Sequence, residues 1–218
     1  MNKAKLILHI GTTKTGTSSF QRILATNQKF LLEKFSIWYR TTKKLQGLLE
    51  NVNEGNDDAP FIGGGNFPKK VRSALKSGDF EEAGKLLEVF FAELSQKEAE
   101  VILISSEALL GTFGSNQKFA DFLSSISSKY FESTEIICVV RPPLDHTVSQ
   151  YSEYVKRRRY STSFDESCLK AFLDIGAYIE PFFKSFGPSN VKIIPYTNAN
   201  QGKSLIGSLL IAINSEFS

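Results

Sequence analysis

The sequence predicts a single α/β domain in which a parallel sheet of about five strands is covered by helices on both faces. Short apolar runs rich in Ile, Val and Leu recur along the chain without alternating with polar residues, as is typical of strands buried on both sides. Amphipathic stretches of helical period lie between these runs. The 218 residues, 41% of them hydrophobic, suit one domain, 1–218, with a substantial core.

The strands are predicted from the apolar runs themselves. The four clear candidates are Lys5–Ile10, Val101–Ser105, Glu135–Val140 and Val191–Pro195, and Ser36–Arg40 is a weaker fifth. Ligands of such sheets bind beyond the carboxyl ends of the strands. The residues that follow each strand are therefore the ones to search for function.

Helices are predicted between the strands wherever apolar positions recur three and four residues apart. In chain order they are one that follows residue 16 and includes Phe20 and Leu31, one capped by Asp79 and Glu82, one from Phe119 to Tyr130, one opened by Pro142 and Pro143, one from Ser163 to Gly187, and one over Leu205–Ile213. The glycine-containing stretch 50–68 is predicted to be a long loop.

A glycine- and threonine-rich segment follows the first predicted strand directly. A strand, a loop of small residues and a helix N-terminus make a phosphate site, because backbone N–H groups converge there and the helix dipole favours an anion. Gly11 and Gly16 have the spacing of the Walker A loop, but Thr17 stands in place of its lysine, and Lys14 lies inside the loop. This departure disfavours a kinase or NTPase that holds its nucleotide with Mg²⁺.

The run Lys14-Thr15-Gly16-Thr17-Ser18-Ser19 resembles the 5′-phosphosulfate loop of the sulfotransferases, and the string from Leu8 to Gln21 is similar to a bacterial branch of that family. The resemblance implies a P-loop-NTPase-like three-layer fold, 3′-phosphoadenosine 5′-phosphosulfate (PAPS) as co-substrate, and no metal. It also implies that Lys14 contacts the sulfuryl group and its bridging oxygen, and that Thr15, Gly16, Thr17 and Ser18 hold the 5′-phosphate. The alternative is a Gly/Thr turn that binds nothing.

A second anion site is predicted at Arg141, which ends another apolar strand, where a guanidinium can form two hydrogen bonds to a phosphate. An arginine followed by a proline and, eight positions on, a serine resembles the 3′-phosphate motif of the sulfotransferases. The resemblance gives Arg141 and Ser149 that role, and it places Tyr196, after the last strand, near the adenine. The alternative is a helix-capping salt bridge and a surface hydroxyl.

Transfer to a hydroxyl or amine needs a general base, and three residues are candidates. Glu107 ranks first, because it follows a strand and its Ser-Ser-Glu string resembles one in bacterial sulfotransferases; the alternative is a helix cap. His9, one residue inside the first strand, ranks second, with a hydrogen-bonded core histidine as the alternative. His146, on the helix after Arg141, ranks third, with a solvated histidine as the alternative.

The acceptor is predicted to be a hydroxyl or amine compound, with a glycan first. The basic run Lys156–Arg159 could dock an acidic polysaccharide, although a solvated helix end that offsets the dipole is the more ordinary interpretation. Asn66, after three glycines, is a candidate for an acceptor loop. The sequence predicts no oligomeric state.

Composition limits the partners and the compartment. A formal charge of +3 is a mild excess, short of the basic stripe of a nucleic-acid binder. Cys138 and Cys168 have neither metal-ligand nor disulfide spacing, which predicts a cytoplasmic protein. The first residues lack the pattern of a signal peptide, and no apolar run has the length of a membrane span.

The chain ends soon after Tyr196, whereas sulfotransferases continue into a basic, glycine-containing loop over the nucleotide. Two interpretations stay open, a naturally short domain and one truncated at its C-terminus. Two other functions also stay open: a P-loop kinase acting on a small molecule, and a catalytically inactive nucleotide-binding module.

Overall fold

All five predicted strands form one parallel sheet in the computed structural model, in the order β2-β3-β1-β4-β5. The structure describes residues 3–11, 17–39, 68–106, 109–110, 115–158, 163–164, 174–196 and 205–217. The strands are β1 (Lys5–Gly11), β2 (Ile37–Tyr39), β3 (Val101–Ser105), β4 (Thr134–Val140) and β5 (Val191–Pro195). The positions of the predicted strands are confirmed, with ends that differ by at most a residue. The predicted burial of Val191–Pro195 on both sides is wrong, because β5 is an edge strand in which Lys192, Ile193 and Pro195 are exposed.

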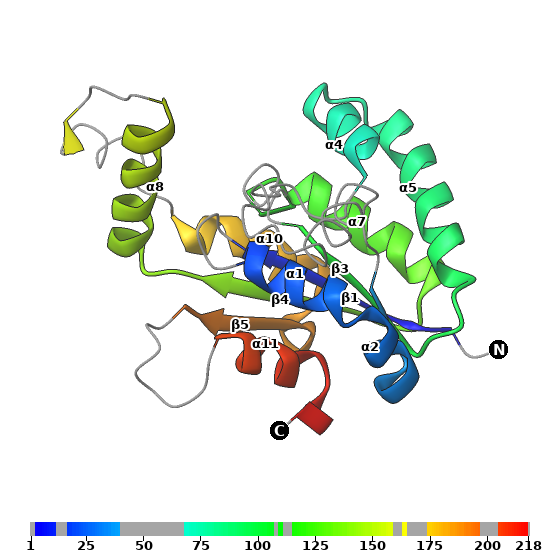
Figure 1. The fold of residues 1–218 in the computed structure, drawn as a ribbon. Coiled ribbons are helices and arrows are strands. Elements are labelled where there is room, and N and C mark those ends of the chain that lie inside the picture. The colour runs from blue at the N-terminus through cyan, green and yellow to red at the C-terminus, as the bar shows by residue number, and fades with distance from the viewer. Residues whose placement is uncertain are drawn as a thin grey trace.

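Helices cover both faces of this sheet, which makes it the middle of three layers (Figure 1). One layer contains α1 (Thr17–Thr26), α2 (Gln28–Phe35) and α11 (Leu205–Ile213). The other contains α4 (Lys69–Lys76), α5 (Phe80–Ser95), α7 (Gln117–Tyr130) and α10 (Ile175–Phe186). The helix α8 (Pro143–Arg158) follows β4. The predicted three-layer α/β fold, with a parallel sheet of five strands covered by helices on both faces, is therefore confirmed.

Alternation along β1 shows why both layers form. Leu6, Leu8 and Ile10 point into the core shared with α5, α7 and α10, whereas Ile7 points into the core shared with α1, α2 and α11. Successive side chains of a strand face opposite sides of a sheet, so a continuous apolar run fills two cores at once. This is why the strand runs lack polar alternation.

Two helix predictions are corrected. The helix predicted after residue 16 is two helices, because Asn27 has non-helical backbone angles and its side-chain amide donates to the carbonyl of Ile23 at 2.8 Å. The helix predicted from Ser163 to Gly187 is interrupted at Asp174, whose carboxylate accepts from the Ala177 N–H at 3.1 Å and so begins α10. Residues 165–173 lie outside the described part of the chain.

Other helix ends follow the predicted signals. The Asp79 carboxylate accepts a hydrogen bond from the backbone N–H of Glu82 at 2.9 Å, as the predicted cap of α5 requires. Gly187 ends α10 with a φ of 83°, a conformation that L side chains rarely adopt. The α4 helix, which begins after Pro68, was not predicted. Nearly all of the predicted loop at 50–68 lies outside the described residues.

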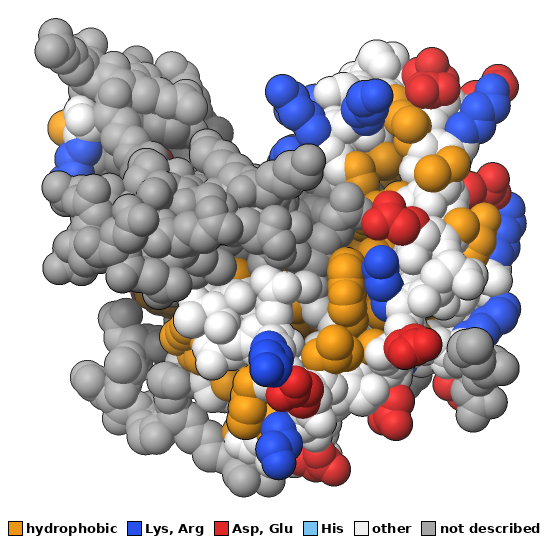
Figure 2. All heavy atoms as spheres, turned by 45° about the vertical axis from the view of Figure 1, so that its right-hand side comes forward, with side chains coloured by type: hydrophobic (Ala, Val, Ile, Leu, Met, Phe, Trp, Pro, Cys, Tyr) orange, Lys and Arg blue, Asp and Glu red, His pale blue; other side chains and the backbone are white. Residues whose placement is uncertain are grey.

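Charges of both signs are mixed on the face that carries α4 and α5 (Figure 2). On α5, for example, the Lys85 ammonium lies 2.7 Å from the Glu81 carboxylate. This face therefore does not carry a single-sign patch. Among the described helices, none combines the length and the apolar character needed to cross a membrane.

Candidate functional site

Four strands bring the predicted site residues to one edge of the sheet. In the register of the parallel ladders, Gly11 of β1 lies opposite Val139 of β4, and His9 of β1 lies opposite Ser105 of β3. On the other side of β4, Val140 lies opposite Pro195 of β5. Because all these strands run in the same direction, the segments that follow them leave from the same edge.

The predicted phosphate loop joins β1 to α1 at this edge. β1 ends at Gly11 and α1 begins at Thr17, with its first turn free of acidic residues. Lys14, Thr15 and Gly16 lie outside the described residues, as do Glu107 and Asn66. The structure describes the two elements on either side of this segment, the central strand β1 and the N-terminus of α1, where unpaired backbone N–H groups favour an anion.

Arg141 and Tyr196 come together across the ends of β4 and β5. The guanidinium carbon of Arg141 lies 4.8 Å from the centre of the Tyr196 ring, within the range of a cation–π interaction. The Tyr196 N–H donates to the Val140 carbonyl at 2.6 Å, so the backbone ties the two strand ends together. Both side chains are half-buried. Two residues that the sequence assigned to one ligand thus form one unit.

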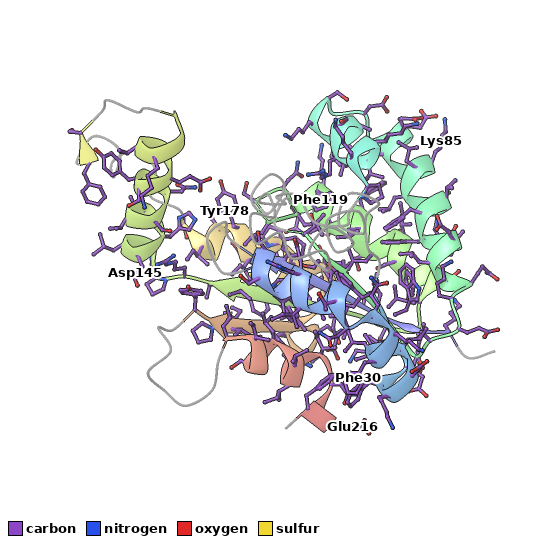
Figure 3. All side chains as sticks on the ribbon, viewed as in Figure 1. Phe30, Lys85, Phe119, Asp145, Tyr178 and Glu216 are labelled. Atoms are coloured by element: carbon purple, nitrogen blue, oxygen red, sulfur yellow. The ribbon has the colours of Figure 1, made fainter. Side chains whose placement is uncertain are left out.

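Ser149 and His146 lie on α8, the helix that starts directly beyond Arg141 (Figure 3, where Asp145 marks its first turn). Ser149 is half-buried, and no contact between its hydroxyl and Arg141 is among the described interactions. His146 is only 3% exposed, so the solvated alternative for this residue is wrong. The helix therefore turns a histidine rather than an apolar residue toward the protein at this point.

His9 lies in the interior, between β1, β3 and α1. Its Nδ1 is 2.8 Å from the Ser105 hydroxyl, and its ring meets Phe20 edge-on with the centroids 5.1 Å apart. Burial lowers the pKa of His9 from 6.5 to about 4, so the imidazole is neutral near pH 7. This position favours the hydrogen-bonded core histidine over the catalytic base.

The sequence analysis missed Gln21 and its partner Ser105 in this region. Gln21 on α1 is 7% exposed, and its amide nitrogen lies 3.0 Å from the Ser105 hydroxyl and 3.3 Å from the Ser105 carbonyl oxygen. A signal was present, because Gln21 stands three positions before Leu24 and four before Ala25, on the buried face of the helix. A polar residue among core positions indicates a buried hydrogen bond.

Known proteins resemble this chain only in the course of the backbone. No protein-family model matches the sequence, and no curated protein matches it significantly. A sulfotransferase from Alicyclobacillus acidocaldarius has 14% identity and a TM-score of 0.43, covering 97% of this chain and 91% of its own. The sulfotransferase domain of the curacin biosynthetic pathway has 12% identity and a TM-score of 0.47, covering 98% and 74%.

A shikimate kinase from Acinetobacter baumannii is as similar, with 13% identity and a TM-score of 0.43, covering 98% of this chain and 94% of its own. Sulfotransferases and kinases therefore both occur among the similar folds. At these identities and TM-scores, the likenesses say nothing of the chemistry of this chain.

Proposed function

We propose that this protein transfers the sulfuryl group of PAPS to a hydroxyl or amine of an acceptor. The observation that carries the proposal is the pairing of β1 with β4, in which Gly11 lies opposite Val139. Lys14 follows Gly11 by three positions, and Arg141 follows Val139 by two. Because neighbouring strands lie about 4.8 Å apart, the chain leaves the sheet toward these two cationic residues at points that one nucleotide can span.

Each end of the nucleotide then has its own partners. The 5′-phosphate binds to the backbone and hydroxyls of Thr15, Gly16, Thr17 and Ser18 at the start of α1, where the helix dipole adds to the attraction. The 3′-phosphate binds to Arg141 and Ser149. Because the Arg141 guanidinium already lies against the Tyr196 ring, its side chain loses less conformational entropy when a phosphate binds. The adenine packs against the exposed part of the Tyr196 ring.

The bound co-substrate supplies an electrophilic sulfur and a phosphate leaving group. An acceptor oxygen or nitrogen forms the new bond to sulfur while the bond from sulfur to the bridging phosphate oxygen breaks, which leaves adenosine 3′,5′-bisphosphate. The Lys14 ammonium lies at the bridging oxygen and stabilises the charge that develops there. Glu107 takes the proton of the acceptor. His9, neutral and enclosed, supports this site without taking that proton, and a glycan hydroxyl is the first acceptor to test.

A thermal-shift comparison tests the nucleotide assignment, because a ligand that binds only the folded protein raises its melting temperature. Adenosine 3′,5′-bisphosphate should raise it for the wild type, and Lys14→Ala and Arg141→Ala should each reduce the shift. Lys85→Ala is the matched control, because Lys85 is exposed and lies across the molecule from Asp145 on α8 (Figure 3). Lys85→Ala should leave the shift unchanged.

Three results would contradict the proposal. An equal shift in all four proteins would show that Lys14 and Arg141 do not hold the ligand. Stabilisation by ATP with Mg²⁺ but not by the bisphosphate would indicate a kinase instead. Bisphosphate binding without sulfate transfer to any acceptor in a panel of glycans, phenols and amines would indicate an inactive nucleotide-binding module.

A further inference from the structure

A buried polar cluster joins α1 to the carboxyl ends of β1 and β3. Its members are His9, Gln21 and Ser105, with exposed fractions of 0%, 7% and 0%. They come from three separate elements, and the Ser105 hydroxyl lies at the centre, 2.8 Å from His9 Nδ1 and 3.0 Å from Gln21 Nε2. Around it the layer is apolar, with Phe20 and Leu24 from the same helix.

The second contact of Gln21 fixes which way its amide points. Its nitrogen also lies 3.3 Å from the Ser105 carbonyl oxygen, and a carbonyl oxygen can only accept. The NH₂ group therefore faces β3 and donates to both the carbonyl and the hydroxyl of Ser105. If the amide group were turned by 180°, its oxygen would face the Ser105 carbonyl oxygen, and two acceptors would meet. Only one orientation of the Gln21 amide therefore fits this contact.

These hydrogen bonds fix the orientation of α1 on the sheet, which its apolar contacts cannot do. Packing of Phe20 and Leu24 holds the helix on the sheet, but the hydrophobic effect has no direction and tolerates small rotations and slides of a helix. Hydrogen bonds have strict geometry, and a buried donor that loses its partner is costly. The cluster therefore sets the height and rotation of α1 above the ends of β1 and β3.

The position of α1 also decides where its N-terminus lies. The helix begins at Thr17, one helical turn before Gln21. Because the cluster holds Gln21, it also holds the backbone N–H groups of the first helical turn, which favour an anion. Two buried polar atoms at this edge, His9 Nε2 and Ser106 Oγ, find no hydrogen-bond partner among the described residues.

We propose that Gln21, Ser105 and His9 are positioning residues that lock α1 to the sheet and thereby fix the position of the helix N-terminus that receives a 5′-phosphate. The identity of the ligand rests on the proposed function, whereas the lock itself does not. The cluster contains no charged group, so it shapes the phosphate site without adding charge to it.

The lock can be tested first without any ligand, by backbone hydrogen exchange. In Ser105→Ala and Gln21→Met, the amides of α1 should exchange about tenfold faster than in the wild type, while those of α7 stay unchanged. Ser127→Ala is the matched control, because Ser127 is equally buried but its hydroxyl donates within α7, to the Ser124 carbonyl. Unchanged exchange of α1 in both lock variants would overturn the lock.

The role in phosphate binding is tested with two ligands that differ only in the 5′-phosphate. By calorimetry, the lock variants should bind adenosine 3′,5′-bisphosphate about tenfold more weakly and bind adenosine 3′-monophosphate as the wild type does. Ser105→Thr, which keeps the hydroxyl, should restore the affinity for the bisphosphate. A merely structural role would weaken both ligands alike or neither, and either result would refute the positioning role.

The two proposals fail in different ways. If the wild type binds neither nucleotide, the proposed function is wrong, and hydrogen exchange still decides whether the lock exists. If the wild type binds the bisphosphate and the lock variants bind it equally well, the proposed function stands and the positioning role is wrong. Melting temperatures of all variants, measured alongside, identify any variant that is not folded.

Discussion

Acid should destabilise the folded protein through His9. Burial lowers the pKa of this residue from 6.5 to about 4, so in acid the unfolded chain binds a proton that the folded chain does not. The contribution of neutral His9 to stability is complete above about pH 6.5, declines as the pH falls toward 4, and levels off below. The contacts explain why, because the neighbours Phe20 and Ser105 offer the imidazolium no counter-charge.

The size of the effect follows from the two pKa values. Their difference corresponds to about 3 kcal/mol in full, at about 1.36 kcal/mol per pKa unit. Between about pH 7.5 and about pH 4.5 most of it is lost, about 2.5 kcal/mol. That is a large fraction of the 5–15 kcal/mol by which domains are typically stable, so about 2.5 kcal/mol is readily measured.

Urea unfolding of the wild type and of His9→Asn at both pH values is the assay. Asn has no proton to gain, so the free energy of unfolding of His9→Asn should fall about 2.5 kcal/mol less than that of the wild type. Carboxylates whose pKa the fold lowers, such as Asp121 and Glu135, contribute equally to both proteins and cancel in the difference. Parallel pH dependences would refute the assignment of His9 as a buried, neutral histidine.

Three further substitutions test the frame of the fold, each by urea unfolding. Glu135 lies 2.6 Å from Lys5 and 2.9 Å from Lys192. Burial pushes the pKa of Glu135 upward, but hydrogen bonds from Lys5 and Lys192 outweigh it and hold the pKa below its usual value. Glu135→Gln should therefore lower the free energy of unfolding by about 1 kcal/mol at low salt and by less at high salt; a difference unaffected by salt would exclude an ionic cause. Asp79→Ala removes the cap of α5 and should cost about 1 kcal/mol, whereas no loss would mean that water replaces the cap. Gly187→Ala should cost about 1 kcal/mol or more, entirely from the φ of 83°, because a Cβ there would meet nothing within 4 Å; an unchanged midpoint would show that the backbone relaxes.

Much of the fold could be predicted because its signals are local. Apart from the short β2, each strand is a mostly apolar run of five to seven residues, so the signal that predicts it lies within the run itself. The cap of α5 and the end of α10 depend on one residue each, Asp79 and Gly187. The breaks at Asn27 and Asp174 were missed because apolar periodicity continues across them, so only the backbone angles reveal them.

The candidate site was predicted in part. The positions of Arg141 and Tyr196 after strands were readable, since a strand end is a local feature, but their contact required knowing that β4 pairs with β5. The burial of His146 was not predicted, because a single histidine on a mixed helix face gives no periodic signal. The geometry at Lys14 and Glu107 stays a prediction.

By itself, the sequence determined the strands, most of the helices and the set of residues that follow the strand ends, because each of these depends on neighbours within a few positions. Only the tertiary structure decided the strand order and the register that bring Gly11 and Arg141 to one edge. It also decided that His9 and Gln21 meet at Ser105, which is 96 and 84 residues away from them. Such contacts form only when the whole sheet is assembled, and no local pattern of residues encodes which distant side chain will lie opposite.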